Sequence, residues 1–346
     1  MRLSVLDQSP LPEGASSALA LRNSIDLARL ADELGYHRYW VAEHHGGGAV
    51  AGAAPEALIG PIAAATERLR VGSGGVMLPH YSPLKVAETF AILAGLFPGR
   101  IDLGLGRASG TDPMTAHALQ RDRRTSIPDD FPAQLAELLA YLEGGFADGH
   151  PFGRLADLPG SPERPVPWLL GSSPQSAQWA AQLGIGYAFA DFINPAGASI
   201  AAEYRGGFAA GERRLQAPRQ AVAAWVIAAD SDAEAARLAT SGRMVFRMMR
   251  RGRLVPVPAP ETAIRFLESE GVDPLALTPG RREILGTPSA VRAQLEALAD
   301  EYGAEEVLAV TIVHSHAARR RSYELLAEAC GLSDTLAVTG EAVAAA

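Results

Sequence analysis

The sequence is poor in cysteine, in positive charge and in long apolar segments. Its single cysteine, Cys330, excludes an internal disulfide and is typical of a protein from a reducing compartment. Asp and Glu outnumber Lys and Arg by 39 to 31, a formal net charge of -8, which argues against a nucleic-acid-binding surface. There is no run of about 18 apolar residues and no apolar segment among the first residues, so we expect neither a membrane-spanning helix nor a secretion signal. These absences predict a cytoplasmic protein.

Several catalytic motifs are also absent. The sequence contains no P-loop, no nucleophile elbow and no Ser-His-Asp order. The segment 104–110, GLGRASG, superficially looks like a dinucleotide fingerprint, but its glycine spacing differs and no helix clearly begins there. The sequence therefore does not predict a Rossmann-type dinucleotide site.

What is present is a regular alternation of apolar strands and helices. The clearest unit is 71–110, in which a glycine-containing strand precedes a helix that begins at Ser82-Pro83 and ends at Pro98-Gly99, and a second strand follows. Such alternation favours a parallel α/β fold, here a (β/α)8 TIM barrel rather than an open sheet. We expect a single domain over 1–346, with an insertion at roughly 251–285 and a mobile loop at roughly 110–131. The predicted strands are 3–6, 39–42, 71–77, 101–105, 166–170, 187–190, 221–229 and 307–313.

In a β/α barrel the active site lies at the carboxyl ends of the strands, and several of these ends are polar or small. Gly171, Ser172 and Ser173 precede a helix that carries Ser176 one turn in, an arrangement that can bind a phosphate through backbone N–H groups and hydroxyls. The alternative is that Ser173 only caps the helix. Arg107 follows a run of small residues, where it either faces an anion or is a solvated surface residue.

The segment Glu43-His44-His45 follows the second predicted strand. One hypothesis is a metal site, with His80 or Asp7 as further ligands, but only fragments of a ligand set are visible. An acid–base or hydrogen-bonding role for His44 in a barrel mouth is favoured over the metal, and a purely structural histidine is the remaining alternative.

Taken together, these stretches resemble the bacterial luciferase-like, flavin-dependent monooxygenase family. The resemblance extends from Met1 to about residue 330 and implies a luciferase-like barrel with one long insertion. It further implies a homodimer that uses reduced FMN from a separate flavin reductase, activates O2 as a C4a-peroxyflavin and oxidises a small organic substrate. The matching segments are WVAEHH, VGSGGVMLPHYSPLKVAETFAIL, GRIDLGLGRASG, WLLGSSPQSAQWAAQLG and LGTPSAVRAQLEAL.

The resemblance also implies roles for individual residues. Gly74 and Gly75 match the family's non-proline cis peptide beneath the isoalloxazine ring, and His44 matches its active-site histidine, with Glu43 expected to orient it. The expected cofactor-binding residues are Gly74, Gly75, Gly106, Arg107, Gly171, Ser172, Ser173 and Ser176. The expected substrate-pocket residues are Asp7, Gln8, Met77 and Phe192. Candidates for a second phosphate-binding arginine are Arg121, Arg123 and Arg124.

Other functions fit the same residues. A deazaflavin coenzyme in place of FMN would make the protein a hydride-transferring dehydrogenase or reductase, and the same fold can also bind flavin without catalysis. A metallohydrolase built on His44 and His45 would require zinc. Gly106 stands where light-emitting members have a reactive cysteine, and the strand end 189–192 lacks their tryptophan, so bioluminescence is not expected.

Overall fold

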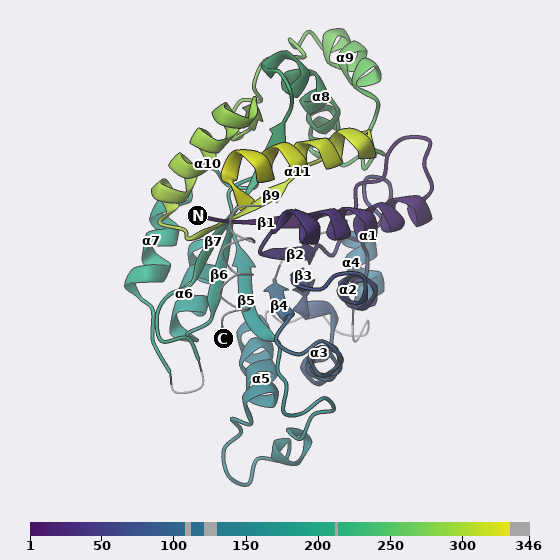
Figure 1. The fold of residues 1–346 in the computed structure, drawn as a ribbon. Helices are drawn as coiled ribbons and strands as arrows, with labels where there is room; N and C mark the ends of the chain where they lie inside the picture. Colours follow the sequence, from purple (N-terminus) through teal and green to yellow (C-terminus); the bar gives the residue numbers. More distant parts are fainter. Residues whose placement is uncertain (108–111, 121–129, 212–213, 333–346) are drawn as a thin grey trace.

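A computed structural model describes residues 1–107, 112–120, 130–211 and 214–332. Eight parallel strands close into a barrel in the order β1-β2-β3-β4-β5-β6-β7-β9, with β9 pairing back to β1 (Figure 1). The predicted (β/α)8 TIM barrel is therefore confirmed. The barrel strands are β1 (Arg2–Asp7), β2 (Arg38–Val41), β3 (Arg70–Met77), β4 (Ile101–Gly106), β5 (Val166–Gly171), β6 (Gly186–Ala190), β7 (Gln220–Ala228) and β9 (Glu306–Val310).

The helices that surround the barrel begin and end at residues with a clear physical reason. Proline opens several of them, and Ser16, Ser173 and Ser231 cap others through their side chains. Gly35 and Gly303 end their helices in the left-handed conformation. The helices are α1 (Ser17–Leu34), α2 (Pro55–Ala64), α3 (Pro83–Leu96), α4 (Pro113–Leu119), α5 (Phe131–Glu143), α6 (Pro174–Gln182), α7 (Ala198–Gly206), α8 (Asp232–Met249), α9 (Pro260–Ser269), α10 (Pro288–Tyr302) and α11 (His316–Cys330).

The amino-terminal half of the barrel interior is filled by a charged and aromatic layer. Arg38, whose side chain is 1% exposed, pairs with Asp102 at 2.6 Å and with Glu306 at 2.5 Å. Its guanidinium carbon also lies 5.2 Å from the ring centroid of Trp40 and 4.7 Å from that of Trp168. This layer forms a floor, so that a cavity can open only toward the carboxyl ends of the strands.

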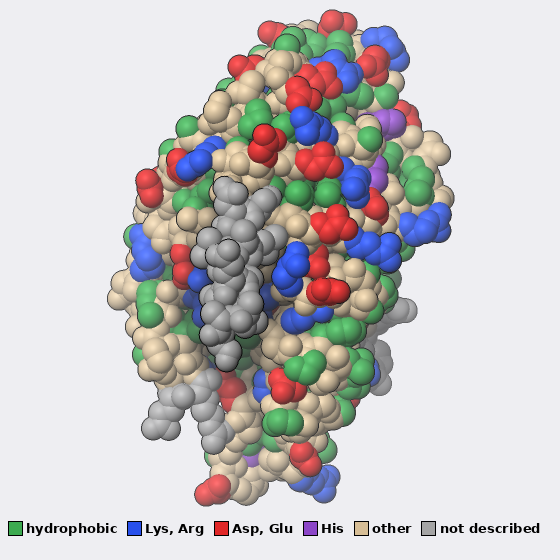
Figure 2. Space-filling model, in the orientation of Figure 1, with side chains coloured by type: hydrophobic (Ala, Val, Ile, Leu, Met, Phe, Trp, Pro, Cys, Tyr) green, Lys and Arg blue, Asp and Glu red, His purple; other side chains and the backbone are tan. Residues whose placement is uncertain are grey.

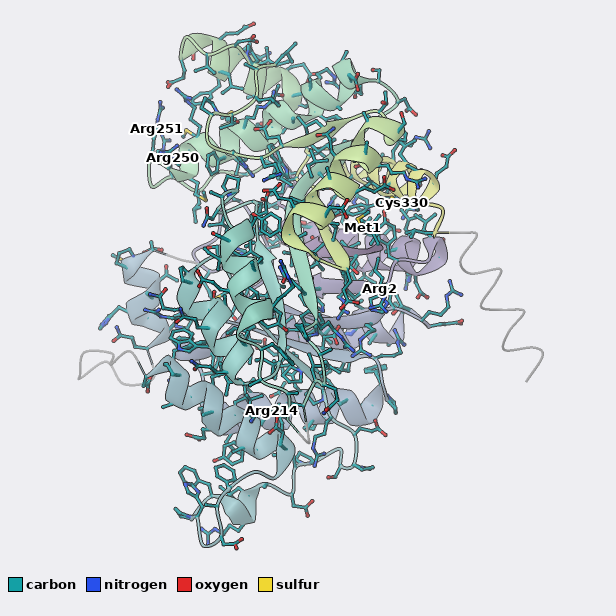
Figure 3. The ribbon with its side chains drawn as sticks, turned by 90° about the vertical axis from the view of Figure 1, so that its left-hand side faces the viewer. Met1, Arg2, Arg214, Arg250, Arg251 and Cys330 are labelled. Carbon is teal, nitrogen blue, oxygen red and sulfur yellow. The ribbon has the colours of Figure 1, made fainter. Side chains whose placement is uncertain are left out.

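The long connection between β7 and β9 covers part of the barrel mouth. It holds α8, α9 and an additional short strand, β8 (Ile284–Gly286), which pairs with the end of β7. The residues around Val257 reach the loop after β1, where Val257 exchanges backbone hydrogen bonds with Leu11 and Glu13 at 2.8 Å each. In Figure 3, Arg250 and Arg251 at the end of α8 lie on the opposite side of the view from Met1 and Arg2, where β1 begins. The connection is thus at the end of the barrel where active sites are found.

The predicted mobile loop 110–131 is described only in part, and α4 lies within it. Arg121, Arg123 and Arg124 lie outside the described residues. Basic and acidic side chains are interspersed over the described part of the face seen in Figure 2. Among the residues with assigned positions, no helix has both the length and the apolarity needed to cross a membrane.

Candidate active site

A cavity of about 460 Å³ opens at the carboxyl ends of the barrel strands, a volume in the range of small-molecule and cofactor sites. It brings together almost all of the residues that the sequence singled out, although they come from strands β1 to β6. The predicted residues that line it are Gln8, His44, Gly74, Gly75, Met77, Gly106, Arg107, Gly171, Ser172, Ser173, Ser176 and Phe192. Asp7 and Glu43 do not line it.

One end of the cavity is polar because α6 begins there. The Ser173 side chain accepts a hydrogen bond from the backbone N–H of Ser176 at 3.4 Å, and the Ser176 hydroxyl donates to the Ser173 carbonyl at 2.7 Å. The same hydroxyl is 2.9 Å from that of Tyr187. A Cβ at Gly171 would lie 2.4 Å from the Ser176 Oγ, so only glycine fits beside this turn. The N-terminus of α6 and the hydroxyls of Ser172 and Ser173 together form an end suited to an anion.

A cation lies near this polar end. Arg107, at the end of β4, is exposed and its guanidinium carbon lies 5.6 Å from the ring centroid of Trp179 in α6. Both side chains line the cavity. The sequence analysis missed Trp179 and Phe131, whose rings are 5.4 Å apart at the cavity wall. Trp179 lies three residues after Ser176, so both side chains fall on one face of the predicted helix. This spacing could have indicated from the sequence that Trp179 lies near the same site.

The other part of the cavity is apolar and lined by small side chains. The predicted cis peptide between Gly74 and Gly75 is present in β3. A Cβ at Gly106 would lie 3.1 Å from the methyl carbon of Met77, so a larger residue there would crowd the wall. The remaining apolar lining includes Leu6, Ala42, Leu169, Leu170, Ala188, Ala190, Ala223 and Leu308. Such a lining leaves room for a flat ring against the backbone.

His44 is the titratable side chain on the β2 side of the cavity. Its Nδ1 atom is buried and has no hydrogen-bond partner among the residues that the structure describes. Burial, reinforced by the charge of His45, lowers the pKa of His44 to about 4. His44 is therefore neutral at pH 7 and offers one nitrogen donor and one nitrogen acceptor to a bound molecule.

The prediction that Glu43 orients His44 is wrong. The Glu43 carboxylate instead accepts hydrogen bonds from the Met77 backbone N–H and the Tyr81 hydroxyl, each at 2.9 Å, and lies 2.7 Å from Nε2 of His45. Consecutive residues of an extended chain point to opposite sides, so Glu43 and His45 share one side and His44 faces the other. Glu43 ties the end of β2 to the end of β3 behind the cavity.

The prediction that Asp7 lines the substrate pocket is also wrong. Its side chain is 0% exposed and accepts hydrogen bonds of 2.6 Å from Arg319, from the Tyr39 hydroxyl and from the backbone N–H of Ser9. The neighbouring residues Leu6 and Gln8 face the cavity, and alternation along β1 turns Asp7 toward the surrounding helices. Asp7 is therefore part of the structural core.

A metal centre was one hypothesis for the Glu43-His44-His45 segment. In the described ranges of the chain, no group of three or more His, Cys, Asp or Glu side chains is arranged to hold a metal ion. His45 and His80 contact each other edge to face, with ring centroids 6.0 Å apart. Glu43 already binds His45, so this cluster is connected internally by hydrogen bonds.

A barrel with a phosphate-suited strand end and an apolar cavity defines a class of cofactor-dependent enzymes, and comparison with known proteins gives the family. The chain belongs to the luciferase-like monooxygenase family, whose model matches residues 1–306. It is 43% identical over 327 residues to a luciferase-like monooxygenase of Escherichia coli (strain K12), covering 93% of this chain and 95% of that protein. It is 38% identical over 331 residues to N-acetyl-S-alkylcysteine monooxygenase of Bacillus subtilis (strain 168), covering 95% and 98%. The family resemblance predicted from the sequence is thus confirmed.

Solved structures agree with this assignment. The crystal structure of apo-MsnO8 matches with a TM-score of 0.87 and 44% identity, covering 96% of this chain and 98% of that one. The fold alone is shared with the oxygenating constituent of 3,6-diketocamphane monooxygenase from Pseudomonas putida in complex with FMN (TM-score 0.69, 20% identity, 94% and 96% covered). It is also shared with an F420-dependent secondary alcohol dehydrogenase (TM-score 0.59, 15% identity, 94% and 98% covered). Solved structures of this fold thus include one in complex with FMN and one F420-dependent enzyme.

Proposed function

We propose that this protein is a monooxygenase that uses reduced FMN and O2 to oxidise a small organic molecule. The observation that carries the proposal is the division of the cavity into an anion-suited end at α6 and an apolar end lined by glycine, alanine and leucine. FMN has the same division, with a phosphate at one end and a flat ring at the other. A separate flavin reductase would supply the reduced cofactor, and a homodimer remains part of the proposal.

The residues present fit FMN. The backbone N–H groups at the start of α6, the hydroxyls of Ser172 and Ser173, and the guanidinium of Arg107 would hold the phosphate. The Ser176 hydroxyl is already bonded to Ser173 and Tyr187, so it would act by fixing the turn. When bound, reduced flavin supplies the activation of O2.

The chain's own contribution to the reaction centres on His44 and on the exclusion of water. The neutral imidazole, whose Nδ1 has no partner in the part of the chain that the structure describes, would donate or accept a hydrogen bond at the reacting atoms of the substrate. The apolar side chains around it keep the cavity dry, which limits side reactions of a reactive oxygen species. Gln8, Met77 and Phe192 would contact the organic substrate, and the B. subtilis relative makes N-acetyl-S-alkylcysteines the first candidates.

The proposal is tested by anaerobic titration with reduced FMN and, in parallel, with reduced F420, followed by mixing with O2 in a stopped-flow instrument. We expect tight binding of reduced FMN, slowed re-oxidation relative to free reduced FMN, and incorporation of isotopically labelled O2 into N-acetyl-S-methylcysteine. Binding of F420 with O2-independent hydride transfer would contradict the proposal in favour of a dehydrogenase. Binding of FMN with re-oxidation as fast as in solution would indicate a non-catalytic flavin-binding protein.

Two variants separate binding from catalysis in this experiment. His44→Ala should leave the affinity for reduced FMN nearly unchanged and lower turnover about 100-fold, the usual contribution of a positioned acid or base. Ser173→Ala should weaken reduced FMN binding about 10-fold, because a hydrogen bond to a charged phosphate is lost. The matched control is Ser231→Ala, which removes a comparable cap from α8, where the Ser231 side chain accepts from the Glu234 N–H at 3.2 Å. That variant should bind reduced FMN like the wild type.

A further inference from the structure

The guanidinium group of one arginine lies between two aromatic rings on the β7 side of the barrel. Arg281 precedes β8, and its guanidinium carbon lies 4.1 Å from the ring centroid of Trp225 in β7 and 4.3 Å from that of Phe246 in α8. Its Nε and Nη1 atoms are buried and have no hydrogen-bond partner within the described part of the chain. Burial lowers the pKa of Arg281 to about 10, so the group is still charged at neutral pH.

The carboxylate closest in sequence to Arg281 is already bound elsewhere. Glu283 accepts hydrogen bonds from Nε and Nη2 of Arg243 at 3.0 and 2.6 Å, and from the backbone N–H of Thr278 at 3.3 Å. The adjacent Arg282 is also paired, with Asp191 and Glu301. Neighbouring arginines thus have carboxylates in direct contact, whereas no described residue accepts a hydrogen bond from Nε or Nη1 of Arg281, and the charge of Glu283 acts on it only from a distance. Buried N–H groups without an acceptor are unfavourable, and these two can donate to an incoming anion.

The position of Trp225 relates Arg281 to the cavity. Trp225 follows Ala223 by two residues on the inward face of β7, and Ala223 lines the cavity. Two residues of a strand span about 7 Å, so the Trp225 ring lies one layer closer to the mouth than the cavity wall. The Nε1 of Trp225 is itself buried and without a partner in the described ranges. It is a second unused donor next to the Arg281 guanidinium.

The neighbouring segment after β6 connects this region to the cavity. Arg282 donates a hydrogen bond of 3.1 Å to the carbonyl of Pro195 and lies 3.1 Å from the Asp191 carboxylate. Between those two contacts are Phe192 and Ile193, which line the cavity. Arg281 is not itself a lining residue; it lies on the β6 and β7 side of the barrel, whereas the phosphate-suited end lies at β5 and α6.

We propose that Arg281 binds the carboxylate of an anionic organic substrate and that the enzyme selects carboxylate-bearing molecules over neutral ones. The Trp225 and Phe246 rings hold the guanidinium plane in place, and one of the two partner-free groups of Arg281, Nε–H or Nη1–H, donates to a carboxylate oxygen. The remainder of the molecule extends past Phe192 toward His44. This assignment rests on the proposed monooxygenase function for the reaction itself, but its anion preference is measured by binding alone.

The test compares N-acetyl-S-methyl-L-cysteine with its primary amide, which has nearly the same shape and no charge. Binding to the flavin-free protein and to the protein with FMN is measured by isothermal titration calorimetry. We expect the wild type to bind the acid at least 10-fold more tightly than the amide. Arg281→Met should weaken acid binding roughly 10- to 100-fold, to the level of the amide, because a hydrogen bond to a charged group is lost. Arg281→Lys should lie between the two, and Arg265→Met, which alters an exposed arginine of α9, should behave like the wild type.

Thermal unfolding distinguishes ligand binding from a structural role. If Arg281 serves a ligand, Arg281→Met keeps or raises the unfolding temperature, because it replaces a buried cation without a direct carboxylate contact by an apolar side chain of similar length. A lower unfolding temperature with unchanged acid binding would overturn the proposal in favour of a packing role. Equal affinities of the wild type for acid and amide, or no binding of the acid at millimolar concentration, would also overturn it.

The proposed function and this inference can fail separately. If reduced FMN does not bind, the monooxygenase proposal is wrong while the ratio of acid to amide affinity still reports on Arg281. If one oxygen atom of O2 is transferred to the thioether sulfur and the other is reduced to water, but Arg281→Met keeps the preference for the acid, the carboxylate site is wrong and the monooxygenase stands. Loss of reduced FMN affinity in Arg281→Met would place the arginine at the cofactor instead and overturn the substrate assignment.

Discussion

Replacing Asp7 by Asn removes one charge from a fully buried ion pair while keeping the volume of the side chain. Asp7 and Arg319 are 0% and 3% exposed, and their closest oxygen and nitrogen atoms are 2.6 Å apart. Burial opposes ionisation of Asp7, but the Arg319 charge and the hydrogen bonds to the carboxylate hold its pKa below the usual value. The aspartate is therefore ionised throughout the neutral range and balances the arginine.

The cost of Asp7→Asn follows from the arginine that remains. Arg319 would keep its hydrogen bond of 3.1 Å to the Thr311 carbonyl but lose its only described counter-ion. Breaking a buried pair from one side costs about 3–5 kcal/mol, whereas replacing both partners by apolar residues is often close to neutral. We therefore expect Asp7→Asn to lower the free energy of unfolding by about 3–5 kcal/mol. The double variant Asp7→Leu with Arg319→Met should recover most of that loss.

Urea unfolding followed by far-ultraviolet circular dichroism and tryptophan fluorescence measures this loss, and anaerobic titration measures reduced FMN binding by the folded fraction. The structural role predicts lower stability with unchanged FMN and substrate affinity, since Asp7 does not line the cavity. An Asp7→Asn protein with wild-type stability and weakened substrate binding would refute the argument and return Asp7 to the substrate pocket. A double variant as unstable as the single one would show that charge balance is not the cause.

Two further predictions concern the cavity walls. Gly171→Ala places a Cβ 2.4 Å from the Ser176 Oγ and must distort the start of α6, so reduced FMN should bind about 10-fold more weakly in the anaerobic titration. Unchanged affinity would exclude this turn from the phosphate site. For His44 the folded-state pKa of about 4 lies below the ordinary histidine value of 6.5, so the unfolded chain takes up a proton first as the pH falls. The contribution of neutral His44 to the free energy of unfolding is fully present above pH 6.5 and decreases by about 3 kcal/mol toward pH 4. In urea unfolding at several pH values, His44→Gln should therefore lose less unfolding free energy between pH 6.5 and pH 4 than the wild type.

The fold could be predicted because its signals are local. Apolar strands such as 71–77 and 101–105 alternate with helices that carry their own caps, and each is recognisable in a short window. The strand predicted over 307–313 ends at Val310, and β8 was missed. Three residues are too few for a periodic pattern, and β8 exists because it pairs with the end of β7, a contact between segments distant in the chain.

The site could be predicted only where its chemistry is local. Ser172 and Ser173 line the cavity, and they could be singled out because a helix N-terminus with its cap is encoded within a few residues; that they bind a phosphate stays a prediction. Asp7 was misassigned because its partner, Arg319, lies 312 positions away in the sequence. No pattern in the residues around Asp7 indicates that it pairs with an arginine. The contact between Arg281 and Trp225 likewise joins distant positions and has no sequence pattern of its own.

Two arginines of the barrel region, Arg38 and Arg281, each lie against two aromatic rings. They differ in their carboxylate contacts, and this difference predicts a structural role for Arg38 and a ligand-binding role for Arg281. Arg38 lies against Trp40 and Trp168 at the floor and is matched by two carboxylates. Arg281 lies between two rings on the β7 side, and no carboxylate among the described residues contacts it directly. Arg38→Met would leave two buried carboxylates without their shared cation and should destabilise the fold by about 3–5 kcal/mol or more, whereas Arg281→Met should not destabilise it. Equal losses of unfolding free energy in the two variants would mean that Arg281 is as structural as Arg38, because the aromatic contacts are common to both and direct contact with a carboxylate distinguishes them.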